Sequence, residues 1–569
     1  MSTKSNPLSR IRVISLGVFV FALFIIVRLY ILQIADHSFY TDKANKQYSS
    51  TVGDLFNRGN IFFSNKDGSL VSAATLESGF AVAINPKVLK NPEEVYTQLN
   101  AILPTDHDSF ITKASKLNDP YEELATKINT EIGNKINALK IPGLTAYEDR
   151  WRFYPGASIA AHTIGMLGFK GNEYAGRYGL EREYEKELER KDTGYVNFFA
   201  QIFSNIKKVA SSESAGEADV VTTIEPTAES YLEGLLSATA RKWSADSIGG
   251  IVMNPATGEI YAMEKYPTFD PNHPEEQKDV NVFSNPLIEN VYEMGSIIKP
   301  LTVSAGIDAG VITATSTYYD AGFVMVNGEK LKNFDSKVRG VVSIQDLLSQ
   351  SLNVGAVHVE QLLGNKLFTK YMYGYGVNQK TGIDLPNEGR NLTLGLESSR
   401  DIEHATASFG QGIALTPIAT IRALAVVANG GFLVSPHVTK GLNYTVGIST
   451  QTAITTYQRV LKPGTTDAVT KLLVHSVDFV LLNGSLHLPH YSVAAKTGTA
   501  QIPNPGGLGY SDKVLHSFIG YFPAYNPKFI ILLYMVNPTG AQFGSETLTT
   551  PFMDMVNFLV NYYEVPPDR

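Results

Sequence analysis

A serine and a lysine stand three positions apart in the middle of the chain, at Ser296 and Lys299. A serine hydroxyl is a poor nucleophile until a base removes its proton, and a lysine amine can be that base only while it is neutral. Since the reference pKa of lysine is about 10.4, burial and a nearby positive charge must lower it. Gly295 indicates a turn into a helix at Ser296, on which residues three apart share one face. The pair is therefore a candidate activated nucleophile.

A second serine, Ser351, and an asparagine, Asn353, open another helical run that ends near Leu363. Placed beside Lys299, the Ser351 hydroxyl could pass a proton between this amine and a leaving amine. The Asn353 amide could orient Lys299 and hold a substrate carbonyl. The same residue types commonly cap helices, which is the alternative interpretation of this motif.

The third motif, Lys496, Thr497, Gly498 and Thr499, ends an alternating strand predicted from Tyr491 to Ala495. A strand edge that carries a cation and two hydroxyls can bind a carboxylate, and a glycine there allows close approach. We therefore assign these four residues to substrate binding.

Three further patterns are expected to be structural. Ser204 to Lys207 repeats the serine–lysine spacing, but no glycine turn precedes it. Lys380 to Gly382 lies among turn-forming glycines rather than at a strand edge. His487 and His490 suggest a metal pair, but Pro489 between them spoils helical geometry and no carboxylate cluster adjoins them. We expect neither a metal site nor a cofactor.

The strands and helices expected around these motifs indicate an α+β domain over residues 216–569. Helical stretches dominate from about residue 296 to 430, with strands on both sides along the chain, so distant segments must close one antiparallel sheet. The individual predictions are strands at Val220–Ile224, Ile248–Met253, Glu259–Glu264, 491–498, 515–523 and 528–537, and helices from Pro226 to about Lys242 and at 550–562.

Residues 35–215 form a separate, non-catalytic module in this interpretation. Alternating apolar residues with an Asn-Lys-Asp-Gly turn predict a hairpin within 51–90, and helical spacing follows over 91–140. A charged helix is expected at Leu180–Arg190. The small-residue run Ser211–Gly216 marks the boundary to the second domain.

The composition excludes several classes of function. Apolar residues make up 44% and charged residues 18%, which permits sizeable cores and excludes a disordered polyelectrolyte. The net charge of −7, without long charge runs, argues against nucleic acid as a partner. Because the chain contains no cysteine, thiol catalysis, cysteinyl zinc sites and disulfides are excluded.

The N-terminal region predicts a membrane anchor. Val13 to Val27 carries no charge, and the apolar run extends to Ile34 if Arg28 snorkels to one membrane face. Basic residues precede this run and no acidic residue appears before Asp36, so the positive-inside rule places residues 1–12 in the cytoplasm. We expect a single span at 13–34 in the cell membrane, with the remaining chain exported. The alternative is a cleaved signal peptide.

Ser-x-x-Lys, Ser-x-Asn and Lys-Thr-Gly, in this order, are the motif set of penicillin-binding proteins and serine β-lactamases. Over nearly its whole length the chain resembles class B penicillin-binding proteins, the monofunctional peptidoglycan D,D-transpeptidases. Further residues familiar in that family are Arg28-Leu29, Leu32-Gln33, Arg58-Gly59, Gly179-Leu180-Glu181, Asn254-Pro255, Thr257-Gly258, Gly410-Gln411-Gly412 and Asn429-Gly430-Gly431.

The resemblance implies a role for each motif. Ser296 would be acylated by a donor stem peptide as D-alanine leaves, with Lys299 as its base and with Ser351 and Asn353 relaying the proton and orienting the substrate. Lys496, Thr497 and Thr499 would bind the terminal carboxylate of D-Ala-D-Ala or of a β-lactam. Backbone N–H groups of Ser296 and Thr499 would form the oxyanion hole.

The resemblance also implies an architecture and partners. The expected fold is the transpeptidase-like fold of serine β-lactamases and penicillin-binding proteins, preceded by one transmembrane helix and an elongated N-terminal α+β pedestal of the dimerisation-domain kind. The expected partners are peptidoglycan stem peptides, β-lactams, the lipid bilayer and a polytopic peptidoglycan glycosyltransferase.

The chain departs from the family pattern after Arg58-Gly59, where Phe63-Ser64 stands in place of an Asp-Arg pair. A structural salt bridge at this place is therefore an open question. Two alternative functions also stay open at this point: a membrane-anchored protein that hydrolyses or senses β-lactams through the same acyl-enzyme, and a regulatory partner of a membrane glycosyltransferase.

Overall fold

The computed structural model describes residues 56–170, 173–190, 216–445, 449–453, 456–504 and 509–569, together with residues 19, 21, 23 and 506. The predicted cytoplasmic tail, 1–12, and the predicted anchor, 13–34, lie outside the described residues apart from Phe19, Phe21 and Leu23. Most of the predicted linker at 211–216 lies outside them as well. In the part of the chain that the model describes, no helix is both long enough and apolar enough to cross a bilayer. The anchor and the linker therefore stay predictions.

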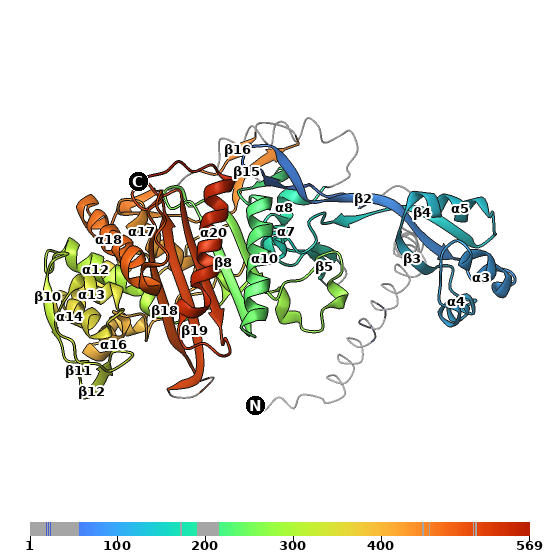
Figure 1. Cartoon of the computed structure of the whole chain (residues 1–569). Helices are drawn as coiled ribbons and strands as arrows, with labels where there is room; N and C mark the ends of the chain where they lie inside the picture. The colour runs from blue at the N-terminus through green and yellow to red at the C-terminus, as the bar shows by residue number, and fades with distance from the viewer. Residues whose placement is uncertain are drawn as a thin grey trace, which may run out of the picture. The chain divides into compact units, whose positions relative to one another are not determined.

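The described residues pack into two compact units (Figure 1). Leu76–Trp151 belongs to one unit, and Arg58–Thr75 with Arg152–Arg569 forms the other. The boundaries between these compact units therefore differ from the boundary at 215/216 that the change in composition indicates.

The smaller unit is an α+β module. Its strands are the second half of β2 (Leu70–Ile84), β3 (Glu122–Ile128) and β4 (Leu144–Phe153), and β2 pairs with both of the others. Three short helices complete it, α3 (Pro92–Asn100), α4 (His107–Ala114) and α5 (Thr130–Ala138). Their apolar faces form one core with the strands, centred on Val82, Leu99, Phe110 and Ile136.

The larger unit is built on one five-stranded antiparallel sheet in the order β18-β19-β20-β8-β9. The strands are β18 (Ala494–Pro503), β19 (Tyr510–Phe522), β20 (Phe529–Val536), β8 (Ser247–Met253) and β9 (Ile260–Tyr266). The prediction that distant segments close an antiparallel sheet is therefore confirmed for these five strands. The predicted strand Val220–Ile224 forms instead as β7 (Ala218–Thr222) in a separate sheet, where it pairs with β15 (Thr439–Tyr444) and, in parallel, with β1 (Ile61–Ser64). The two strands predicted at Ile248–Met253 and Glu259–Glu264 form the hairpin of β8 and β9, whose turn is Asn254–Gly258, where Gly258 has a φ of 84°.

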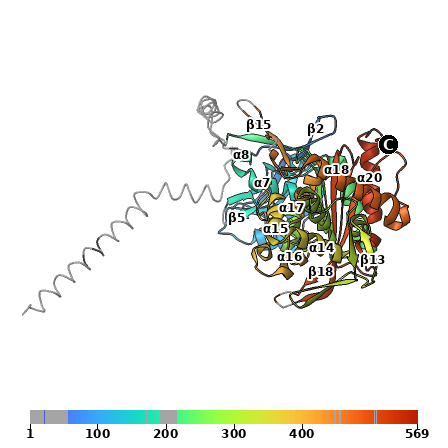
Figure 2. The ribbon, with the colours of Figure 1, turned by 90° about the vertical axis from the view of Figure 1, so that its left-hand side faces the viewer.

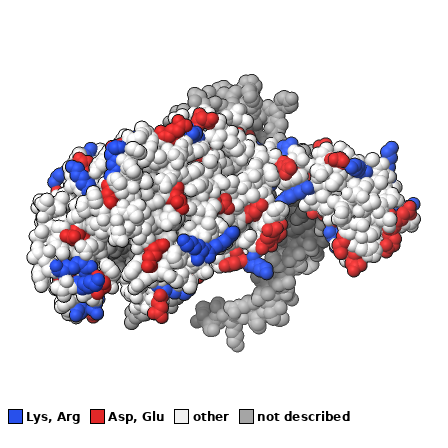
Figure 3. Space-filling view, viewed as in Figure 1, with Lys and Arg blue, Asp and Glu red and all other residues white. Residues whose placement is uncertain are grey.

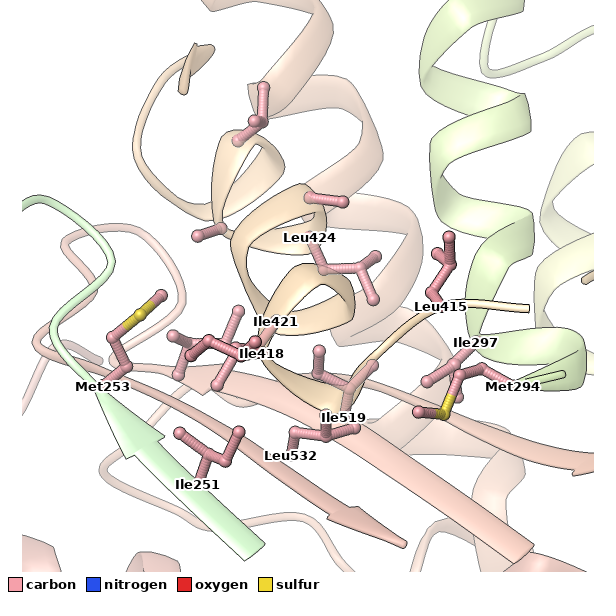
Figure 4. Packing of buried hydrophobic residues seen from close by; sticks show 14 of the residues in the cluster. Ile251, Met253, Met294, Ile297, Leu415, Ile418, Ile421, Leu424, Ile519 and Leu532 are labelled. Atoms are coloured by element: carbon pink, nitrogen blue, oxygen red, sulfur yellow. The ribbon is translucent and has the colours of Figure 1, made fainter. Parts of the chain in front are cut away.

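Helices cover both faces of this sheet. On one face lie α10 (Pro226–Lys242) and α20 (Thr549–Tyr562), which are side by side in Figure 1, and on the opposite face lies α17 (Pro417–Ala428), which the turned view shows (Figure 2). Because both faces are buried, β20 is apolar throughout, and successive residues of the strand enter different cores. Figure 4 shows side chains of α17 packed against the sheet: Ile418, Ile421 and Leu424 against Ile251, Ile519 and Leu532.

Along the chain, the segment between β9 and β18 is mostly helical and carries much of the site. It contains α12 (Lys299–Asp308), α13 (Ile344–Ser349), α14 (Asn353–Leu363), α15 (Asn365–Gly374), α16 (Asp401–Ala407) and α18 (Pro463–His475). The prediction of helix from 296 to 430 missed two small hairpins. In these, β10 (Thr317–Asp320) pairs with β13 (Gly340–Ser343), and β11 (Phe323–Val326) pairs with β12 (Glu329–Lys332). The turn of the second hairpin is Asn327-Gly328, a strong hairpin signal.

The larger unit also contains a buried charge network around Arg58. Its Nε lies 2.7 Å from the Glu181 carboxylate, and the Nε of Arg152 lies 2.6 Å from the other oxygen of the same group. A second ion pair joins Arg58 to Glu185 at 2.8 Å. Arg58 thus forms buried salt bridges, but Phe63 and Ser64 do not replace the charges of an Asp-Arg pair, and the Ser64 hydroxyl donates to the Thr222 carbonyl at 2.7 Å instead. Glu181 and Glu185 lie on α7 (Gly179–Glu183) and α8 (Glu185–Leu188), two short helices where one continuous helix over 180–190 was predicted.

Charged side chains are sparse and mixed in sign on the face shown in Figure 3. Acidic and basic groups alternate over the helices and the sheet of the larger unit, in keeping with the small net charge of −7. The chemistry of the protein is therefore not carried by a single charged surface on this face.

Candidate active site

The serine motif lies on a tight turn that leads into the buried helix α12. Gly295–Ile298 forms one 3-10 turn and the α-helix begins at Lys299, so the helix starts three residues later than predicted. Gly295 has a φ of 64°, and a Cβ atom there would come within 2.8 Å of the Thr499 carbonyl oxygen. Only glycine meets both conditions, and the turn therefore lies directly against strand β18.

The Lys299 amine is within reach of the Ser296 hydroxyl. Its Nζ lies 2.9 Å from Ser296 Oγ, donates a hydrogen bond to the Ser351 carbonyl at 2.6 Å, and lies 3.2 Å from Ser351 Oγ. The lysine is completely buried. Burial, and secondarily the charge of Lys496, lower the pKa of Lys299 well below its ordinary value. A neutral amine beside the serine is what the sequence argument required of a general base.

Ser351 holds its position through an unusual backbone conformation. Its φ of 57° is left-handed, which is uncommon for a residue other than glycine and costs conformational energy. In this conformation both the carbonyl and the hydroxyl of Ser351 reach Lys299, and the same hydroxyl accepts a hydrogen bond from Lys496 Nζ at 2.9 Å. The Ser351 hydroxyl therefore connects the two lysines.

Lys496 is the cation of the strand motif. Its side chain is buried, which lowers its pKa to about 7, and Nζ also donates to the Thr497 carbonyl at 2.8 Å. Strand β18 is at the end of the sheet order, with β19 on its inner side. Its outer edge faces the serine turn instead of another strand, which leaves backbone groups of that edge available to a substrate.

Gly498 makes the close approach of the strand possible. A Cβ atom there would lie 2.3 Å from Ser517 Oγ and 2.8 Å from the Met294 carbonyl oxygen. These two groups already share a hydrogen bond of 2.8 Å, which ties β19 to the serine turn beneath Gly498. Thr497 and Thr499 are partly exposed along the strand, and the Thr499 hydroxyl accepts a hydrogen bond from Gly544 N at 2.9 Å.

Comparison with known proteins shows which family has these motifs in this order. The family model for the penicillin-binding protein transpeptidase domain matches residues 248–556, more than half of the chain, and includes all three motifs. The model for the penicillin-binding protein dimerisation domain matches residues 56–208. The chain belongs to the class B penicillin-binding proteins.

Named relatives and solved structures agree with this membership. Stage V sporulation protein D of Bacillus subtilis is 29% identical over 95% of this chain and 83% of its own length. The peptidoglycan D,D-transpeptidase FtsI of Escherichia coli K12 is 24% identical over 78% of this chain and 73% of its own. These comparisons confirm the predicted family.

Two solved structures share the fold. Penicillin-binding protein 2X of Streptococcus thermophilus has a TM-score of 0.71 at 20% identity, covering 90% of this chain and 80% of that one. Penicillin-binding protein 3 of Mycobacterium tuberculosis, complexed with aztreonam, has a TM-score of 0.69 at 21% identity, covering 91% and 98%. The predicted transpeptidase-like α+β fold is confirmed.

In this penicillin-binding protein the observed place of Asn353 differs from the predicted one. Its amide donates to the Lys332 carbonyl at 2.9 Å, whereas Lys299 is held by the Ser351 carbonyl. The residue before α14 is Leu352, and neither Ser351 nor Asn353 caps this helix end, where Val354 N donates instead to Asn333 Oδ1 at 3.1 Å. The helix-capping alternative is therefore wrong. The prediction that Asn353 orients Lys299 is also wrong for this structure, while a substrate contact of Asn353 stays a prediction.

The three patterns expected to be structural have different outcomes. Lys380–Gly382 lies in an irregular loop between two turns and not in a strand, and the Glu388 carboxylate accepts a hydrogen bond from Gly382 N at 3.0 Å. Ser204–Lys207 lies outside the described residues. His487 pairs with the Asp478 carboxylate at 3.2 Å, and among the described residues no group of three potential ligands could hold a metal ion.

No sequence motif predicted two further contacts at the site. The rings of Phe334 and Phe543 meet edge to face with centroids 5.5 Å apart, the first two residues after Lys332 and the second next to Gly544. Glu293, just before the serine turn, accepts a hydrogen bond from the Tyr510 hydroxyl at 2.9 Å. Such pairs join residues far apart in the chain, so spacing along the sequence carries no signal for them.

Proposed function

We propose that this class B penicillin-binding protein is a peptidoglycan D,D-transpeptidase, which cross-links stem peptides through an acyl-enzyme on Ser296. The observation that carries the proposal is the 2.9 Å contact between the Ser296 hydroxyl and the fully buried amine of Lys299. A relative, FtsI of Escherichia coli, bears the name of this activity.

Acylation follows from the positions of these groups. The neutral Lys299 amine accepts the Ser296 proton while Oγ attacks the carbonyl carbon of the D-Ala–D-Ala peptide bond. Backbone N–H groups of Ser296 and Thr499 would stabilise the oxyanion, and losing one such donor typically costs about a hundred- to a thousand-fold in rate. The C–N bond then breaks, and the leaving D-alanine amine takes the proton from Lys299 through the Ser351 hydroxyl, which both lysines contact.

Transfer uses the same groups in the opposite direction. The amine of a second stem peptide attacks the Ser296 ester and loses a proton through Ser351 to Lys299. Collapse of the intermediate breaks the ester C–O bond and returns the proton to Ser296 Oγ. The products are a new peptide bond between the two stem peptides and the free enzyme.

The edge of β18 would hold the terminal carboxylate of the donor peptide. Lys496 supplies a positive charge in a buried position, and the Thr497 and Thr499 hydroxyls line the same strand. A β-lactam presents a carboxylate beside a strained amide, so it would acylate Ser296 in place of the peptide. Because the opened ring stays attached, no amine departs to make room for the acceptor.

Intact-protein mass spectrometry after exposure to benzylpenicillin tests the proposal. We expect one adduct with the mass of the whole penicillin, mapped to the peptide that contains Ser296 and absent in Ser296→Ala. Serine at position 204 provides the matched control, since Ser204→Ala should leave labelling unchanged. Unaltered labelling of Ser296→Ala would remove this serine from the mechanism, and turnover of penicillin within seconds would favour a hydrolase.

The location of the protein forms a second part of the proposal: it is anchored in the cell membrane by residues 13–34, with the catalytic unit outside the cytoplasm. The support is the uncharged run Val13–Val27, preceded by Lys4, Arg10 and Arg12. Treating spheroplasts with protease should degrade the catalytic unit, while a cytoplasmic marker protein should be degraded only after the spheroplasts are lysed. Recovery of the full chain in the soluble fraction would contradict an anchor.

The partner proposed for the anchor and residues 35–215 is a polytopic peptidoglycan glycosyltransferase. Its support is the match of residues 56–208 to the dimerisation-domain model, which makes this region a candidate for protein contacts. Detergent-solubilised full-length Ser296→Ala should co-purify with such an enzyme as well as the unaltered chain does. Full complementation of a deletion by Ser296→Ala would make binding, not chemistry, the essential role.

A further inference from the structure

The side chain of Glu293 joins three separate segments at the active site. Its Oε1 accepts a hydrogen bond from Gly412 N at 3.1 Å, and its Oε2 accepts one from the Tyr510 hydroxyl at 2.9 Å. Glu293 itself lies three residues before Ser296, just before the turn Gly295–Ile298 that leads into α12. One carboxylate therefore contacts both the 410–412 loop and the start of β19.

Each partner of Glu293 belongs to a segment that borders the nucleophile. On one side, the Gly410 carbonyl accepts a hydrogen bond from Gly295 N at 3.1 Å, next to Ser296. On the other side, Tyr510 is the first residue of β19 and opposes Pro503 at the far end of β18. Glu293 thus spans the turn from one bordering segment to the other.

The contact with Tyr510 adds a second attachment between the hairpin and the serine turn. The first is the hydrogen bond from Ser517 Oγ to the Met294 carbonyl, which lies opposite Gly498 in the middle of β18. Strand β20 pairs with β19 only from Leu515 to Phe522, so the Tyr510 end of the hairpin extends past β20, and the contact with Glu293 attaches that end to the segment before Ser296. The strand that carries Thr499 is therefore held at a defined distance from Ser296.

The electrostatic environment of Glu293 agrees with a held carboxylate. Burial raises its pKa, and the hydrogen bonds from Tyr510 and Gly412 oppose that rise. The two donors therefore replace water that the carboxylate loses on folding. A carboxylate whose only role was to be polar at the surface would not need two donors from separate segments.

We propose that Glu293 is a positioning residue for acyl transfer, which locks the β18–β19 hairpin and the 410–412 loop against the turn that carries Ser296. The inference rests on the proposed transpeptidase function. It predicts an effect on the chemical step, because oxyanion donors on two separate segments must keep their spacing within a fraction of an ångström. Glu293 touches no reacting atom in this scheme.

The test measures acylation of the full-length protein by a fluorescent penicillin at several concentrations, which separates the acylation rate constant from the dissociation constant of the initial complex. We expect Glu293→Ala to lower the rate constant by about ten- to a hundred-fold, with the dissociation constant changed by less than about three-fold. Tyr510→Phe should lower it less, since Gly412 still holds the carboxylate. Glu293→Gln retains a carbonyl acceptor and should stay within about three-fold of the unaltered protein.

The double variant Glu293→Ala with Tyr510→Phe decides whether the two residues act as one unit. If they do, the second change adds nothing to the first, whereas independent effects multiply. Lys513→Ala is the matched control on the same strand, since Lys513 makes an exposed ion pair with Asp246 at 3.1 Å. Its acylation rate constant should not change.

The outcomes separate this inference from the proposed function. A protein that penicillin does not label at Ser296 at all would refute the transpeptidase proposal itself. Labelling of the unaltered protein together with an unchanged rate constant in Glu293→Ala would refute only the positioning role, as would multiplicative effects in the double variant. If Glu293→Ala fails to fold, Tyr510→Phe decides the question, because it removes one contact of the carboxylate and retains the others, and an unchanged rate constant in Tyr510→Phe would then refute the positioning role.

Discussion

Lys299 and Lys496 approach the same oxygen atom, with their Nζ atoms 3.2 and 2.9 Å from Ser351 Oγ. Two ammonium groups this close in a buried site repel each other, so one of them releases its proton more readily. Burial lowers the pKa of both lysines, and the charge of Lys496 lowers the pKa of Lys299 in addition. The pair therefore divides into a base and a cation, which are the two functions that acyl transfer from a carboxylate-bearing donor requires.

Replacing Lys299 should remove activity and stabilise the fold. The folded-state pKa of Lys299 lies below its unfolded value, so folding near neutral pH releases a proton at a cost in free energy. Lys299→Met avoids that cost, and we expect a higher thermal midpoint at pH 7, with an advantage that shrinks as the pH approaches 10. Penicillin acylation should fall by about a hundred- to ten-thousand-fold. Calorimetry across pH checks the first result, and a midpoint below that of the unaltered protein at pH 7 would contradict it.

The second-order rate constant of acylation should show a bell-shaped pH profile. Lys299 must be neutral, which gives the acid limb, and Lys496 must be charged to bind the carboxylate, which gives an alkaline limb near its pKa of about 7. Lys496→Met should remove the alkaline limb and lower the rate. It should also move the acid limb to higher pH, because the charge that helps to depress the pKa of Lys299 is gone. Stopped-flow measurements with both proteins test this, and an acid limb that stays in place would show that Lys496 does not influence Lys299.

A methyl group at position 498 should slow acylation. In Gly498→Ala the new Cβ would meet Ser517 Oγ and the Met294 carbonyl at 2.3 and 2.8 Å, so β18 must move away from the serine turn. A displacement near 1 Å costs about a hundred-fold in rate. Gly464→Ala is the matched control, since nothing lies within 4 Å of a Cβ atom there. Equal acylation rates for the two variants would mean that the close approach at Gly498 does not matter for the chemistry.

The buried acids Glu229, on α10, and Glu264, on β9, should make the protein less stable at alkaline pH. Burial and the neighbouring Glu264 carboxylate raise the pKa of Glu229 well above its usual range, while burial raises that of Glu264 to about 8. An acid with a raised folded-state pKa loses stability as the pH rises from its unfolded value towards the folded one. Glu229→Gln can still accept the 2.7 Å hydrogen bond from Met263 N without titrating.

The thermal midpoint of Glu229→Gln should therefore exceed that of the unaltered protein by a margin that grows between pH 5 and pH 9. The exposed residue Glu276 supplies the control, because Glu276→Gln should show a constant difference over the same range. A margin for Glu229→Gln that does not depend on pH would mean that this acid is not protonated in the folded protein.

Local sequence signals predicted those elements whose boundaries are set by local chemistry. Helix α10 begins at Pro226 and ends at Lys242 as predicted, because proline suits a first turn and the Glu225 side chain accepts a hydrogen bond from Ala228 N. The β8–β9 hairpin was predicted for a similar reason. The hairpins between residues 317 and 343 were missed because their strands are short and partly exposed, which leaves no clear apolar alternation.

By itself, the sequence determined the chemical identities at the site: which serine, which two lysines and which glycine. Those identities follow from spacing within a turn, a helix start and a strand, all of which are local. Only the tertiary structure decided that the Ser351 carbonyl, in a left-handed conformation, holds Lys299 in place of Asn353, and that Glu293 reaches Tyr510 across more than two hundred residues. Contacts of this kind depend on how the sheet and the helices pack, because packing brings together residues that have no fixed separation along the chain.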